Sequence, residues 1–125
     1  MKQSNVERMI DEITEGIYQD YPELLERYGE RGREKCREDN QHHFHQLHTA
    51  YKMKNDQFFI DYANWLNGVL TSRGMKSEHL IDNFNRIKKS VWKEEQSDEQ
   101  EAYIHMLQKA NESLSKEKAT ISQQK

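Results

Sequence analysis

Four of the six histidines lie close together in the chain, at positions 42, 43, 45 and 48. An imidazole can bind a metal ion, and it can donate or accept a proton near neutral pH. These histidines belong to residues 32–51, which read as a helix of about five turns. At about 100° per residue, one apolar stripe of that helix carries Cys36, Asn40, Phe44, Leu47 and Tyr51. The stretch therefore raises two questions: whether it binds a metal, and whether polar groups on its apolar side contact a ligand.

The spacing His42-x-x-His45-x-x-His48 can place metal ligands on adjacent turns of a helix. However, the helical wheel puts His42 and His45 opposite the apolar stripe, where we expect them to face water. There is also no glutamate between two histidines as in the zinc-protease motif. The pattern favours a solvated, histidine-rich face over a metal site.

Asn40 and His43 are the polar residues of most interest, because Asn40 sits in the apolar stripe and His43 on its flank. A buried polar side chain needs a hydrogen-bond partner. The pair therefore either joins a hydrogen-bond network in the core, for example with Tyr62, or contacts a ligand. Both interpretations stay open. A pH-sensing role of His43 is a further hypothesis, since histidine changes charge near neutrality.

Arg33 and Arg37, one turn apart, could donate to an anion such as a carboxylate. Ion pairing with the neighbouring Glu34, Glu38 and Asp39 is the alternative. Nearby aromatic residues belong first of all to the core, and they would equally line an apolar channel. The candidate ligand-binding residues are Arg33, Arg37, Asn40, His43, Phe44, Leu47, Tyr51, Phe59, Tyr62 and Leu66.

Catalytic motifs are missing from the sequence. Cys36 lies on the apolar stripe without a paired base, which disfavours a catalytic thiol. We find no nucleophile elbow, phosphate loop or dinucleotide fingerprint. The sequence therefore predicts that the protein is not an enzyme.

The composition is that of one small domain, residues 1–125, with little apolar material. Apolar content is 34% and charged content 33%, which is lean for a chain that buries a core alone. A homodimer would supply the missing apolar surface. The net charge of −3, with both signs interspersed, disfavours nucleic acid as a partner.

Three features favour a cytoplasmic protein. The single cysteine cannot form an internal disulfide and fits a reducing compartment. Residues 1–5 lack the apolar core of a signal peptide. No apolar run approaches the length of a membrane span.

The apolar spacing predicts five or six helices and no strand, an all-α fold. A capping box, Ser4-x-x-Glu7, starts the first helix, and Pro22 stops it. Pro22 also opens a short second helix, which Gly29 and Gly32 end. The central helix then runs from about 33 to 53.

The remaining helices are marked by caps and glycines. Asp56 and Ser77 are the predicted N-caps of two helices, and Gly74 is the C′ glycine between them. The second of these helices carries Trp92 among its apolar residues. A second box, Ser97-x-x-Gln100, opens the last helix. Residues from about 116 to 125 are polar, and we expect this tail to fray.

Two blocks of the sequence resemble a known family. The first covers residues 21–36 and continues with Glu38-Asp39-Asn40. The second covers residues 58–66, together with Arg73-Gly74-Met75. Over roughly residues 5–115 the chain is similar to the non-haem globin sensor domains of bacilli. These include stand-alone sporulation-inhibitory sensor proteins and the sensor domain of a sporulation histidine kinase.

The resemblance implies a globin-like, haem-free bundle that forms a homodimer through its helices. It also implies an internal apolar channel for a fatty acid, with a small anion such as chloride nearby. Such a stand-alone domain would compete with the sensor histidine kinase for its signal and so inhibit sporulation signalling. In this interpretation the protein has no cofactor beyond a bound fatty acid and chloride.

Two alternatives remain. The protein could be an interaction module that pairs directly with the kinase sensor domain through its wide apolar faces. It could also be a haem-binding globin sensor with a histidine as proximal ligand, although the polar residues at 42–48 disfavour a haem pocket. The same blocks resemble helical domains that precede cobalamin-binding modules, but this chain lacks such a module.

Overall fold

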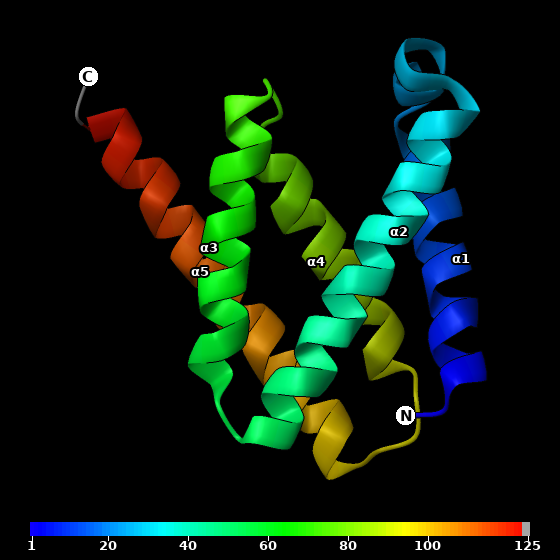
Figure 1. Ribbon diagram of the computed structural model, residues 1–125, viewed down its shortest axis with the longest axis vertical. Coiled ribbons are helices and arrows are strands. Elements are labelled where there is room, and N and C mark those ends of the chain that lie inside the picture. The colour runs from blue at the N-terminus through cyan, green and yellow to red at the C-terminus, as the bar shows by residue number, and fades with distance from the viewer. Residues whose placement is uncertain (124–125) are drawn as a thin grey trace. The chain divides into compact units, whose positions relative to one another are not determined.

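The structure, a computed structural model, describes the backbone of residues 1–123 and the side chains of residues 1–116. This part of the chain forms five helices and no strand, which confirms the all-α class (Figure 1). The expected frayed tail at about 116–125 lies mostly outside the side chains described and stays a prediction. The helices are α1 (Gln3–Asp20), α2 (Glu23–Met53), α3 (Asp56–Ser72), α4 (Ser77–Trp92) and α5 (Asp98–Gln123).

The chain divides into two compact units, Met1–His45 and Gln46–Lys125, and α2 contributes to both. The single domain expected from the sequence stays a prediction. Among the described helices, none is both long enough and apolar enough to cross a membrane.

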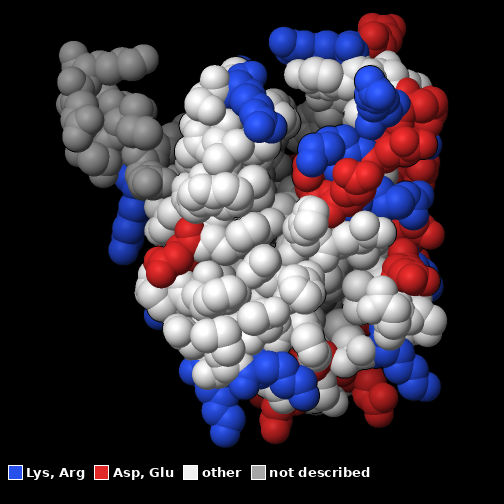
Figure 2. Space-filling view, in the orientation of Figure 1, with Lys and Arg blue, Asp and Glu red and all other residues white. Residues whose placement is uncertain are grey.

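The first unit contains α1 and the first part of α2. The buried face of α1 consists of Met9, Ile10, Ile13, Thr14, Ile17 and Tyr18. Two ion pairs join α1 to α2: Arg33 to Glu15, with 2.7 Å between Nη1 and Oε1, and Arg37 to Asp11. Acidic and basic side chains are intermixed over these two helices (Figure 2). Exposed ion pairs contribute only about 0–1 kcal/mol each to stability. We therefore expect these two pairs to align α1 with α2 and to add little to the free energy of unfolding.

The predicted end of the short helix at Gly29 is confirmed, and the role predicted for Gly32 is wrong. Gly29 is non-helical (φ 65°, ψ −163°) and divides α2 at a kink into a short first helix and a long second one. Gly32 lies inside the helix and does not end it. A Cβ atom there would lie 2.4 Å from Cβ of Tyr28 and 2.9 Å from the hydroxyl of Tyr18. Gly32 therefore permits a close approach between side chains of α1 and α2.

Three predicted N-caps are wrong in position. Lys2 is the N-cap of α1 and makes no side-chain capping bond, so Ser4 lies inside the helix. Asp56 and Ser77 are each the first residue of their helix and not the residue before it. In all three cases the polar residue lies in the first turn of the helix, and the N-cap is an earlier residue.

Two predicted helix ends are confirmed. Gly74 has φ 89°, and the amide of Met75 donates to the carbonyl of Leu70 at 3.0 Å, as in a Schellman motif. At the start of α5, the amide of Gln100 donates to the hydroxyl of Ser97 at 3.1 Å.

The second unit is built around α3, α4 and α5, which contact one another. Phe59 of α3 and Phe84 of α4 are fully buried, with ring centroids 5.4 Å apart. Asn64 and Ser113 link α3 to α5 through a hydrogen bond of 3.0 Å. The face of α5 that packs inward consists of Gln100, Tyr103, Met106, Leu107, Ala110 and Leu114.

Candidate functional site

The predicted apolar stripe of α2 is buried over its central turns. Asn40 and Leu47 are fully buried and Phe44 is nearly so, whereas Cys36 and Tyr51 are half-buried. The amide of Asn40 donates to the carbonyl of Cys36, one turn earlier, at 3.0 Å. The side-chain amide of Asn40 thus has a hydrogen-bond acceptor within its own helix.

His43 lies in the interior, only 2% exposed. Burial, with a smaller effect of the neighbouring His42, lowers the pKa of His43 to about 3. The imidazole is therefore neutral at physiological pH, with one nitrogen as donor and the other as acceptor. This contradicts the hypothesis that His43 senses pH, because a group with so low a pKa stays neutral from about pH 5 to 8.

Two polar atoms of the same unit are buried without a hydrogen bond. The hydroxyl of Thr14, on the buried face of α1, has no hydrogen-bond partner among the described residues. Nε of Arg33 also makes no hydrogen bond, although it forms an ion pair of 3.6 Å with a carboxylate oxygen of Glu30. A buried polar group without a partner costs about 1–3 kcal/mol, so each such group calls for an explanation.

Arg33 and Arg37 each form an ion pair with a carboxylate of α1, and Arg33 also pairs with Glu30 of α2. Nη1 of Arg33 is 2.7 Å from Glu15, and its guanidinium carbon lies 5.3 Å from the ring centroid of Tyr18. Arg37 pairs with Asp11. The sequence suggested partners within the helix, and helical spacing alone could not indicate these contacts.

The ten candidate ligand-binding residues are divided between the two units. Arg33, Arg37, Asn40, His43 and Phe44 belong to the first, and the other five belong to the second. In the second unit, Phe59 packs against Tyr62 with 5.8 Å between ring centroids, and Leu66 is half-buried. Tyr51 meets Tyr103 edge to face at 6.3 Å.

His42 and His45 are exposed, as the helical wheel predicts. His48 approaches α5, where its Nδ1 lies 3.5 Å from the hydroxyl of Tyr103 and 3.8 Å from a carboxylate oxygen of Glu99. Burial, together with the charge of Glu99, raises the pKa of Tyr103. Across the described residues, no three His, Cys, Asp or Glu side chains are grouped as a metal site would require.

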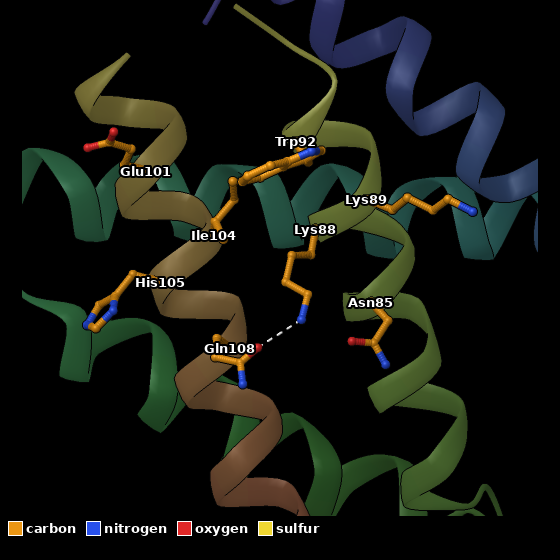
Figure 3. A pocket seen from close by; sticks show the side chains of 8 residues that line it. All are labelled: Asn85, Lys88, Lys89, Trp92, Glu101, Ile104, His105 and Gln108. Carbon is orange, nitrogen blue, oxygen red and sulfur yellow. Dashed lines mark hydrogen bonds between the residues drawn. The ribbon is translucent and has the colours of Figure 1, made fainter. Parts of the chain in front are cut away.

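A groove between α4 and α5 was not predicted. Its volume is about 630 Å³, and Trp92 lies at its edge with 72% of its surface exposed. The sequence placed Trp92 on the apolar side of its helix, but Val91 takes the buried position. Figure 3 shows the lining residues Asn85, Lys88, Lys89, Trp92, Glu101, Ile104, His105 and Gln108. The sequence feature that could have indicated this exposed site is the position of Trp92 at the last residue of its helix, next to Val91.

Comparison with known proteins adds no assignment: no family model, curated protein or solved structure matches the chain.

Proposed function

We propose that the protein is a non-enzymatic sensor domain that binds a small amphiphilic ligand beside α1 and the first part of α2. The observation that carries the proposal is a set of buried polar atoms in this unit, two of which make no hydrogen bond. Thr14 Oγ1 and Arg33 Nε are buried without hydrogen bonds, and neutral His43 lies in the interior. A bound ligand with an anionic or polar group would supply the missing contacts.

The resemblance to non-haem globin sensor domains supplies the ligand class and the biological role. The ligand would be a fatty acid, accompanied by a small anion such as chloride, in a globin-like and haem-free fold. The homodimer and a cytoplasmic location belong to the same proposal. A stand-alone domain of this kind would inhibit sporulation signalling by competing with a sensor histidine kinase for the signal.

The test measures binding of myristate to the purified protein by titration calorimetry. Thr14→Val removes the unpaired hydroxyl but keeps the shape of the side chain, and we expect about fivefold weaker binding from the loss of one hydrogen bond. Thr71→Val is the matched control, because the hydroxyl of Thr71 already donates to the carbonyl of Asn67 at 2.8 Å. Unaltered affinity in Thr14→Val, or no binding by the unmodified protein, would count against the proposal.

A further inference from the structure

Trp92 is the most exposed of the large apolar side chains identified on the surface, yet its backbone is firmly held. The side-chain amide of buried Gln100 donates to the carbonyls of Val91, Trp92 and Glu94 at 3.0, 3.2 and 2.9 Å. The end of α4 is therefore fixed from α5. Binding at Trp92 therefore requires no ordering of its backbone, and tryptophan is enriched at binding hot spots.

The groove beside Trp92 has an apolar end and a basic side. Trp92 reaches toward Ile104, and Nζ of Lys88 is held by the side-chain oxygen of Gln108 at 2.8 Å (Figure 3). Lys89 points away from α5 and is exposed. Trp92 and Ile104 offer an apolar contact to a molecule bound in the groove. Lys88 and Lys89 favour a bound molecule with negative charge.

Lys88 and Lys89 are not among the basic residues that form ion pairs within the described part of the chain. Pairs with carboxylates are formed by Arg8, Arg33, Lys35, Arg37 and Arg86. By contrast, neither lysine of the groove pairs with a carboxylate of any described residue, and the partner of Lys88 is a neutral amide. In a chain of net charge −3, the lining of this groove carries two lysines and one carboxylate, Glu101.

We propose that the α4–α5 groove docks an acidic, amphipathic helix of a partner protein. Apolar side chains of that helix would pack on Trp92 and Ile104. Aspartate or glutamate residues about one turn away would pair with Lys88 and Lys89, in the helix-in-groove mode. This site lies within the second unit and is separate from the ligand site proposed on α1 and α2, so the two proposals succeed or fail independently.

A second copy of the chain fits this groove less well. A two-fold contact sets the same face against itself. The lysines would then meet a surface on which Glu101 is the only carboxylate among the lining residues. An acidic segment from another protein compensates both lysines without this repulsion.

The experiment selects binders to the full chain from a displayed library of helical peptides of about four turns. We expect enriched peptides to combine apolar residues at helical spacing with an excess of Asp and Glu. Trp92→Ala should weaken their binding by about tenfold or more, as at a hot spot. The control is Trp65→Ala, because Trp65 is also exposed (65%) but lies on α3, outside the groove.

A charge reversal tests the basic side. Lys88→Glu with Lys89→Glu should abolish binding of the acidic peptides, whereas Lys109→Glu, an exposed position of α5 outside the lining residues, should preserve it. Three results would overturn the proposal: no enrichment or no acidic excess, an equal loss in Trp65→Ala, or a homodimer that Trp92→Ala converts to monomers. The last would assign the groove to a second copy.

Discussion

The side-chain amide of Gln100 donates to the carbonyl of Trp92 at 3.2 Å, and also to the carbonyls of Val91 and Glu94. One residue of α5 thus donates to three carbonyls in and just after the last turn of α4, and the carbonyl of Val91 also accepts from the backbone amide of Glu94 at 3.0 Å. Because an amide carries only two hydrogens, at least one of them is shared between two acceptors.

Replacing Gln100 by Met should destabilise the fold, since methionine has a similar volume but no donor. We expect a loss of about 1–3 kcal/mol in the free energy of unfolding, because the carbonyls of Val91, Trp92 and Glu94 lose the amide donor of Gln100. Urea denaturation followed by circular dichroism measures this. Gln96→Met is the control: Gln96 is exposed, and the change there should stay within about 0.5 kcal/mol. Equal effects at the two positions would show that the Gln100 bonds contribute nothing.

His43 should make the fold less stable in acid. Its pKa is lowered to about 3 by burial, while an unfolded histidine titrates near 6.5. The unfolded state therefore binds the proton first, and stability contributed by neutral His43 is complete above about pH 6.5 and is lost as the pH falls toward 3.

Between pH 7 and pH 5 this loss amounts to about 2 kcal/mol. The His43→Gln variant should lack this part of the pH dependence, although it will be less stable overall. Denaturation curves of both proteins at the two pH values test the prediction, and His45→Gln, at an exposed position, is the control. Parallel pH profiles in the wild type and His43→Gln would contradict the low pKa of His43.

Replacing Lys54 by glycine should stabilise the fold. It follows the end of α2 with φ 54°, a backbone conformation that costs a lysine about 1 kcal/mol and glycine almost nothing. Lys54→Gly should therefore raise the free energy of unfolding by up to about 1 kcal/mol. Lys52→Gly, inside the last turn of the same helix, should lower it by about 1 kcal/mol. Thermal unfolding of both variants measures whether each change stabilises or destabilises the fold. Lower stability in both variants would refute the prediction.

Substitution by alanine should have opposite effects on stability at Gly32 and at Gly68. A Cβ at Gly32 would clash with Tyr28 and Tyr18, so Gly32→Ala should cost about 1–3 kcal/mol of stability. Gly68, in the middle of α3, has no neighbour within 4 Å of a built Cβ. Gly68→Ala should stabilise by about 0.5–1 kcal/mol, because alanine favours the helix. If Gly32→Ala is also neutral or stabilising, the contact with the two tyrosines is not tight.

Local sequence patterns predicted the helices better than their ends and contacts. Helical period and glycine placement predicted the all-α class, the buried stripe of Asn40 and Leu47, and the helix end at Gly74. The cap at Ser4 failed because a polar residue with capping chemistry is also tolerated within the first turn.

Contacts between distant parts of the chain were beyond prediction. No spacing rule pairs Arg33 with Glu15, or Gln100 with the carbonyls that end α4. Trp92 was predicted only as one of the apolar residues of its helix, and its exposure at the groove did not follow from the sequence. The ligand-binding set and the family resemblance stay predictions.

The most direct test of the proposed sensor function is native mass spectrometry of the freshly purified protein, with an absorption spectrum of the same sample. The account predicts a homodimer that carries the mass of a fatty acid and shows no Soret band. A protein that carries no lipid and binds no added fatty acid would contradict it, and a Soret band would replace it with a haem-binding sensor.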